Sequence, residues 1–120
     1  MPQHIKKYEK SREYFFVEGC FINELANSAD DPDVSIARAR VTPGVTTNWH
    51  RLVATTERYV ILEGSGEVEI GEYAPKQVGT GDVVIIPPDT RQRIRNTGET
   101  DLIFLAICSP RFQERHYIDS

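Results

Sequence analysis

Short runs of apolar and β-branched residues, separated by turn residues, recur along the whole chain. The runs cover residues 14–17, 20–22, 34–41, 49–52, 58–62, 67–70, 83–86, 92–95 and 102–108. Gly, Pro, Asn and Asp are frequent between them, at residues 29–33, 43–44, 64–66, 71–75, 87–88 and 96–98. Short strands with closely spaced turn signals are typical of an all-β sandwich or barrel.

One group of turn residues predicts how two neighbouring strands are connected. The sequence Gly-Ser-Gly at residues 64–66 predicts a hairpin between the strands at 58–62 and 67–70. Helical periodicity is weak throughout, and only residues 9–15 and 112–117 are compatible with a single turn of helix. No linker or low-complexity stretch interrupts the chain. The sequence therefore predicts one antiparallel all-β domain over residues 1–120.

Composition narrows the range of partners. The chain has 120 residues and a formal net charge of −4, so charge does not support a nucleic-acid partner or an anionic membrane. Cys20 and Cys108 lack CxxC spacing and lie beside strand-like residues, which predicts two reduced, buried thiols. Residues 1–10 are polar, and no run of ~18 apolar residues occurs. We therefore expect a cytoplasmic protein without a membrane partner.

Two groups of residues have the spacing of a known pair of motifs. The first group is Gly44, His50, Leu52, Glu57 and Gly64, and the second is Gly81, Pro87, Asp89, Gln92 and Asn96. In this spacing and order the chain resembles the small single-domain members of the cupin superfamily. The departures from the family pattern are Leu52 and Gln92, where histidines are usual, and Asp89, where glycine is usual. Asp tolerates the left-handed backbone conformation better than most residues, so we expect Asp89 to be a structural replacement.

The resemblance implies an antiparallel β-barrel of the jelly-roll type. Residues 1–13 would then form an N-terminal arm and residues 110–120 a C-terminal tail. It also implies pairing into a homodimer through sheet edges, and the aromatic strand near residues 14–16 is an edge that needs covering.

Alternation along the strands indicates which side chains accompany the motif residues. His50 shares a face with Asn48 and Leu52, Glu57 with Tyr59 and Ile61, and Gln92 with Ile94. The resemblance implies that these faces line the barrel interior. His50, Glu57 and Gln92 are then candidate metal ligands, and Glu57 and Tyr59 are candidate catalytic residues. Candidate substrate contacts are Asn48, Leu52, Ile61 and Ile94.

Three functions remain open from these residues. The first is a cupin that binds a divalent metal such as Zn, Mn, Fe or Ni through His50, Glu57 and Gln92 and acts on a small organic molecule. The second is a metal-free isomerase, epimerase or dehydratase with a His50–Glu57 acid–base pair and Tyr59 as the opposite proton donor. The third is a non-catalytic domain that binds a small ligand in a cavity made more apolar by Leu52. The fold alone does not decide, because fold does not specify chemistry.

Five arginines are informative, because their orientation affects which ligand charge the interior favours and how the surface is charged. Arg38 and Arg40 share one face of a strand, and an inward orientation would favour an anionic ligand. A solvated or interface face is the alternative that we prefer. Arg91, Arg93 and Arg95 lie opposite the face of Gln92 and are expected to point outward and to pair with surface carboxylates.

Overall fold

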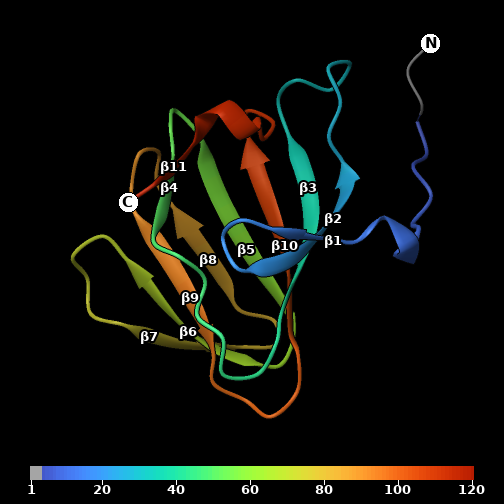
Figure 1. Ribbon diagram of the computed structural model, residues 1–120. Helices are drawn as coiled ribbons and strands as arrows, with labels where there is room; N and C mark the ends of the chain where they lie inside the picture. The colour runs from blue at the N-terminus through green and yellow to red at the C-terminus, as the bar shows by residue number, and fades with distance from the viewer. Residues whose placement is uncertain (1–3) are drawn as a thin grey trace.

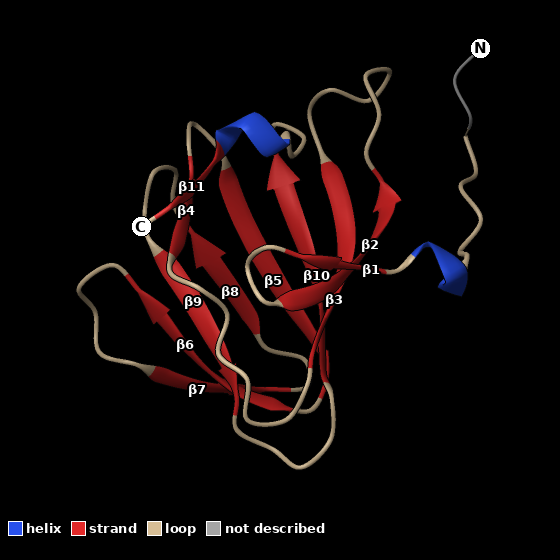
Figure 2. Cartoon of the chain, in the orientation of Figure 1, coloured by secondary structure: helices blue, strands red, loops and turns tan. Residues whose placement is uncertain are grey.

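The computed structural model describes residues 4–120, and strands dominate it (Figures 1 and 2). The strands in chain order are β1 (Tyr14–Phe16), β2 (Cys20–Ala26), β3 (Ser35–Val41), β4 (His50–Leu52), β5 (Thr56–Glu63), β6 (Ser65–Ile70), β7 (Lys76–Gly79), β8 (Val83–Ile86), β9 (Gln92–Asn96), β10 (Leu102–Ser109) and β11 (Tyr117–Asp119). Two 3₁₀ turns, η1 (Lys10–Arg12) and η2 (Glu114–His116), lie within the two segments expected to allow a turn of helix. Among residues 4–120, no helix is long and apolar enough to span a membrane.

The strands form two antiparallel sheets. One sheet has the order β1-β2-β3-β10-β5-β8, and the other has the order β11-β4-β9-β6-β7. The expected all-β jelly roll is confirmed, although the hydrogen bonding forms two separate sheets rather than one closed barrel. Strand β1 is at one edge of the six-stranded sheet, so among residues 4–120 the edge expected to meet a second copy has no strand paired on its outer side.

The predicted hairpin at residues 64–66 is wrong. β5 pairs with β10 and β8, whereas β6 pairs with β7 and β9, so the chain passes from one sheet to the other at Gly64. Gly64 has a φ of +89°, and a Cβ there would lie 2.8 Å from the carbonyl oxygen of Asp101. The glycine signal identified a turn, but it did not specify which strands lie on either side of it.

Burial alternates along the central strands, as the pattern of residues predicts. In β5 the side chains of Glu57, Tyr59 and Ile61 are buried, and their neighbours are more exposed. In β9, Gln92 and Ile94 are buried in the same alternating way. The inward positions nearest the starts of β5 and β9 are Glu57 and Gln92, which are polar, and the apolar Ile61 and Ile94 follow further along. Asn96, the last inward residue of β9, is polar again. The interior is therefore an apolar core with a polar region near one end.

Two strands were not predicted from the sequence. β7 is short and polar, and β11 lies in the segment expected to be a C-terminal tail. β11 pairs with β4, with Tyr117 opposite Leu52 and Asp119 opposite His50. The C-terminal segment is therefore part of the five-stranded sheet, next to the strand that bears the motif histidine.

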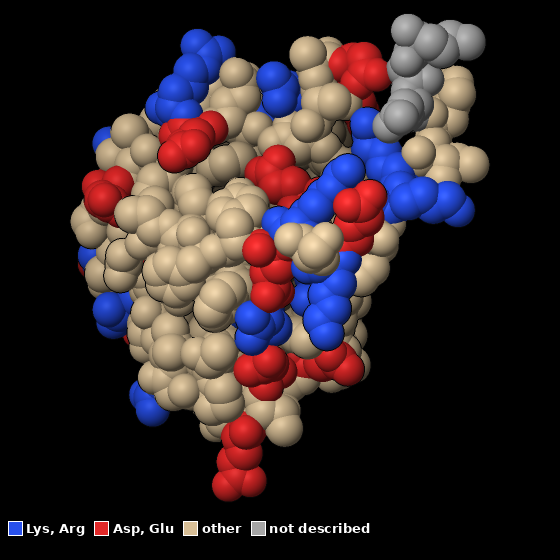
Figure 3. All heavy atoms as spheres, turned by 45° about the vertical axis from the view of Figure 1, so that its right-hand side comes forward, with Lys and Arg blue, Asp and Glu red and all other residues tan. Residues whose placement is uncertain are grey.

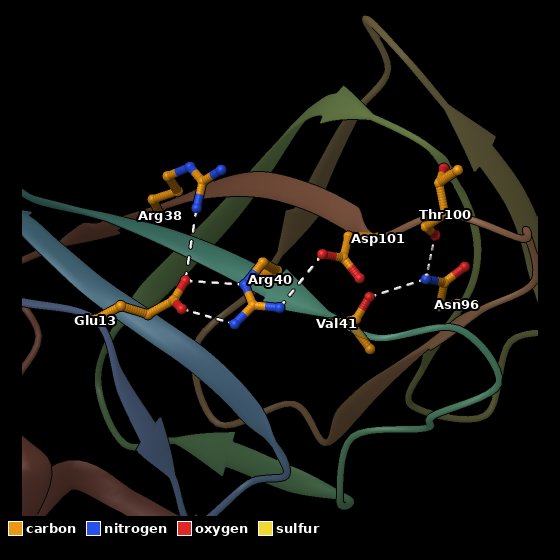
Figure 4. Close-up of polar contacts among 7 residues, drawn as sticks. All are labelled: Glu13, Arg38, Arg40, Val41, Asn96, Thr100 and Asp101. Carbon is orange, nitrogen blue, oxygen red and sulfur yellow. Dashed lines mark hydrogen bonds and ion pairs between the residues drawn. The ribbon is translucent and has the colours of Figure 1, made fainter. Parts of the chain in front are cut away.

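Two motif residues stabilise turns and have no chemical role. Asp89 has a φ of +61°, the left-handed conformation expected for it, and its carboxylate accepts a hydrogen bond from the Ala54 amide at 3.2 Å. Asn96 donates from its amide nitrogen to the carbonyl oxygens of Val41 and Thr100, both at 2.8 Å (Figure 4). These bonds satisfy buried backbone acceptors where the chain changes sheets.

The arginines expected to point outward do so. Arg40 binds both carboxylate oxygens of Glu13, at 2.7 and 3.0 Å, and Arg38 lies 3.6 Å from the same group (Figure 4). The hydrogen bond from Arg40 lowers the pKa of Glu13 below its ordinary value. Figure 3 shows basic and acidic side chains next to each other on this face rather than a patch of one sign.

The second arginine group pairs with carboxylates on the five-stranded sheet. Arg93 binds Glu69 at 2.9 Å and Arg91 binds Glu72 at 3.3 Å, and both guanidinium groups stack on the Trp49 ring. The contacts of Arg91 and Arg93 match the expected surface role, whereas Arg95 is exposed and has no carboxylate partner among residues 4–120.

The sheet-to-sheet corner gives a first prediction. Gly64→Ala places a methyl group against the Asp101 carbonyl and forces an L-residue into a positive φ, whereas Gly81→Ala has a similar φ of +92° and open space. We expect Gly81→Ala to lower the free energy of unfolding by ~1–2 kcal/mol and Gly64→Ala to lower it by a further ~1–3 kcal/mol. Urea unfolding of both variants measures the difference. Equal losses would show that the close approach at Gly64 carries no cost.

Candidate functional site

A cavity of about 50 Å³ lies between the two sheets, near the polar end of the interior. Its aromatic lining residues are Tyr14, Phe16, Tyr59, Phe104, Phe112 and Tyr117, and its acidic ones are Glu18, Glu24 and Glu57. His50, Leu52 and Cys108 also line it. The space exceeds the ~10–15 Å³ that one water needs. It can therefore hold several waters or part of a small organic molecule.

Three buried polar side chains form a hydrogen-bonded chain at this cavity. The amide nitrogen of Gln92 donates to Oε1 of Glu57 at 2.7 Å. The hydroxyl of Tyr59 donates to the amide oxygen of the same Gln92. Tyr59 and Glu57 are two residues apart on β5, so both point inward, and Gln92 lies opposite His50 in the pairing of β9 with β4. Each exchanges water for a protein partner, which offsets the cost of burial.

His50 is held from two directions. Its Nδ1 lies 2.7 Å from the backbone oxygen of Asn48, and its Nε2 lies 3.3 Å from Oε2 of Glu18. The ring of Tyr117 stacks on the imidazole, with the centroids 5.1 Å apart. A carbonyl oxygen can only accept a hydrogen bond, so Nδ1 of His50 carries a proton. The contact between Nε2 of His50 and the Glu18 carboxylate is favourable when one further proton lies between these two groups. Glu18 and His50 then act as a couple that shares one proton and has no net charge.

Glu18 is the functional candidate that sequence reasoning missed. It lies in the turn between β1 and β2, beside Gly19, whose φ is +100°. The Asn48 amide donates to the Glu18 carbonyl at 2.7 Å and fixes this turn against the segment before β4. The available signal was a single acidic residue between the aromatic strand and Gly19-Cys20, which does not by itself indicate a partner.

Burial raises the pKa of both carboxylates. The pKa of Glu57 is raised to about 7, first by desolvation and then by the negative charge of Glu18, although His50 and Gln92 oppose the shift. The pKa of Glu18 is also raised to about 7, mainly by desolvation. Burial raises the pKa of the Tyr59 hydroxyl well above 10. Two carboxyl groups can therefore accept or release protons close to neutral pH.

The other predicted contact residues fall into two groups. Leu52 lines the cavity. Ile61 and Ile94 are buried in the core and are not among the lining residues. Asn48 is exposed and donates from its side chain to the backbone oxygen of Val17 at 3.1 Å, away from the cavity. β4 begins at His50, so the alternation of strand faces does not extend back to Asn48.

The proposed metal-ligand set does not fit a metal ion in this arrangement. The amide oxygen of Gln92 accepts from Tyr59, and its amide nitrogen faces the Glu57 carboxylate. An amide used as a ligand would have to present its oxygen to the ion. Across residues 4–120, no group of three or more His, Cys, Asp or Glu side chains is placed to hold a metal ion.

The two cysteines are free and buried, as expected. Cys108 lines the cavity, and desolvation is the largest cause of the raised pKa of its thiol. A protonated thiol is a poor nucleophile. Neither cysteine therefore adds a reactive group to the site.

Comparison with known proteins establishes the family. The chain belongs to the cupins, because residues 37–108 match the Cupin_2 cupin domain. An uncharacterized protein of Methanocaldococcus jannaschii, MJ1618, is 32% identical over 108 residues, covering 88% of this chain and 86% of that protein.

Solved cupin structures share the fold at lower identity. The nucleoside dehydratase Pac13 of Streptomyces superposes with a TM-score of 0.77 and 19% identity, over 95% of this chain and 89% of that one. An oxalate decarboxylase of Lactobacillus farciminis superposes with a TM-score of 0.76 and 22% identity, over 89% of this chain and 32% of that one. At these identities the likeness concerns the fold.

The raised pKa of Glu57 predicts a pH-dependent stability. The folded protein keeps the Glu57 proton up to about pH 7, whereas the ordinary value is 4.5, so the folded state binds more protons between these limits. The free energy of unfolding should therefore fall as pH rises through this window. Glu57→Gln removes this titration and should reduce the slope by up to ~1.4 kcal/mol per pH unit.

Urea unfolding at several pH values from 4.5 to 8 measures the slope. Glu63→Gln, which changes an exposed carboxylate on the same strand, is the matched control and should keep the slope of the unmodified protein. A slope that is the same in Glu57→Gln and in the unmodified protein would contradict the assignment.

Proposed function

We propose that this cupin is an enzyme that moves protons at carbon, a dehydratase or isomerase acting on a small organic molecule without metal chemistry. One observation carries the proposal: a Glu18–His50 couple and a Glu57–Gln92–Tyr59 chain line or adjoin one cavity. The couple supplies a proton, and the Glu57 carboxylate takes one. Such paired roles at near-neutral pKa are what general acid–base catalysis needs.

The dehydration step balances with these groups alone. Glu57 takes a proton from a carbon next to an electron-withdrawing group, and the electron pair of the broken C–H bond forms a C=C bond. The C–O bond on the adjacent carbon breaks, and the leaving hydroxyl departs as water with the proton of the Glu18–His50 couple. Transfer of the proton from Glu57 to the couple restores the site. In an isomerisation, the proton returns to carbon at another position.

Gln92 and Tyr59 position the base in this scheme. The Gln92 amide fixes one oxygen of Glu57, and the Tyr59 hydroxyl fixes the amide. The Tyr59 proton is committed to Gln92, so Tyr59 acts through Gln92 rather than as the proton donor. The dehydratase reported for the Pac13 fold shows that this fold can host such chemistry, and it supports the reaction class only.

Turnover of a substrate panel in the presence of EDTA tests the proposal. The panel contains hydroxy-ketones, sugars and nucleosides, including uridine, and NMR in D₂O detects both loss of water and exchange of carbon-bound protons. We expect turnover without added metal. Glu57→Gln and His50→Gln should each lower kcat by roughly 10²–10⁴-fold. Tyr59→Phe should lower it by roughly 5–10-fold, since it removes one buried hydrogen bond.

Glu63→Gln is again the matched control and should retain full turnover, because it lies away from the cavity. Loss of turnover in EDTA that Zn, Mn, Fe or Ni restores would replace the proposal with a metal-dependent mechanism. Tight binding across the panel without any turnover would identify a ligand-binding domain.

A further inference from the structure

The charges that line the cavity are of one sign. Glu18, Glu24 and Glu57 line it, together with His50, and no Lys or Arg of residues 4–120 does. Arg38 and Arg40, which would have favoured an anionic ligand if they pointed inward, bind Glu13 outside. The Glu18–His50 couple has no net charge when it shares one proton, which leaves Glu24 and Glu57 as the charges that a ligand meets.

The positive side chains of this region lie around the cavity and are not among its lining residues. Arg111 lines the outer groove and donates to the side-chain oxygen of Asn27 at 2.9 Å. Arg12 pairs with Glu9 at 3.2 Å, and Lys6 and Lys7 line a neighbouring depression that shares Tyr14, Glu24 and Asn27 with the cavity. An anion inside the cavity would lose its hydration and face carboxylates, and no Lys or Arg of residues 4–120 lines that space to offset the cost.

The walls add a second feature that suits a cation. Phe16 contacts three other lining rings edge-on, with centroid distances of 6.4 Å to Tyr14, 6.2 Å to Phe112 and 5.2 Å to Tyr117. Aromatic faces attract ammonium groups, and more strongly where water is excluded. The hydroxyl of Tyr117 is buried and has no hydrogen-bond partner among residues 4–120, so it can accept a hydrogen bond from a ligand N–H group.

The cavity also continues into an open groove. Tyr14, Phe16, Glu24, Asn27 and Phe112 line both the cavity and a groove of about 660 Å³. The inner space of about 50 Å³ accommodates a small head group, and the groove has room for the remainder of a longer molecule. Glu24 lies where the two spaces meet and accepts a hydrogen bond from Asn27 at 3.1 Å.

We propose that the cavity selects small organic ammonium compounds, with the cationic head between the carboxylates and the aromatic rings. This inference names the substrate class of the site described above and so rests on the proposed function for its catalytic meaning. Anions are excluded from the interior, and neutral molecules of the same shape bind less tightly.

Three probes of nearly equal shape test the selection. Benzylamine is cationic, benzyl alcohol is neutral and benzoate is anionic, and each is titrated into the full chain at pH 8 by calorimetry. We expect benzylamine to bind at least tenfold more tightly than benzyl alcohol, and benzoate to show no binding. Glu24→Gln should weaken benzylamine by roughly tenfold and leave benzyl alcohol unchanged, because only the cation interacts with the removed charge. Glu63→Gln should change neither.

Equal affinities for benzylamine and benzyl alcohol, binding of benzoate, or no binding of benzylamine would each overturn the proposal. The two proposals fail separately. A preference for benzylamine without turnover of any panel substrate would support the ligand class and remove the acid–base function. Turnover of neutral or anionic substrates, with no preference for benzylamine, would support the acid–base function and remove the proposed ligand class.

Discussion

The interior of this protein depends on one constraint: ionisable side chains buried between two sheets must find partners within the chain. Gln92 donates a hydrogen bond to Glu57 and accepts one from Tyr59. His50 contacts both the Glu18 carboxylate and the Asn48 carbonyl oxygen. Glu57 and Tyr59 of β5 both bind Gln92 of β9, and Glu18 of the β1–β2 turn meets His50 of β4, so the two sheets must come together in the correct register before these contacts form. The site and the fold are therefore stabilised by the same contacts, and changes to one will affect the other.

Much of this arrangement could be predicted from sequence, because alternation shows which side chains share a strand face and the resemblance to cupins implies that these faces line one interior. His50, Glu57 and Gln92 were expected to converge, and the structure brings them together: β4 pairs with β9 at His50 and Gln92, and Gln92 binds Glu57. The inward positions of Tyr59 and Leu52 follow from the same two-residue period. Alternation is a local property of each strand, so it can be recognised in the sequence without knowing which strands are neighbours.

The rest depends on non-local geometry. Glu18 reaches His50 through a turn that packs against another segment, and nothing in its own neighbourhood specifies that partner. The glycines at 64–66 indicate a turn, but a turn within one sheet and a crossing between two sheets have the same local signature. Likewise β11 has only three residues, and its place beside β4 is decided by pairing rather than by propensity.

The position of β11 has a consequence for how the protein is made. Tyr117 covers the imidazole that the site depends on, and it belongs to a strand at the far end of the sequence from the turn that supplies Glu18. During synthesis the turn that bears Glu18 leaves the ribosome well before β11 does. A nascent chain that has not yet reached Tyr117 lacks the ring that stacks on His50, so the site would be complete only after translation has passed this strand.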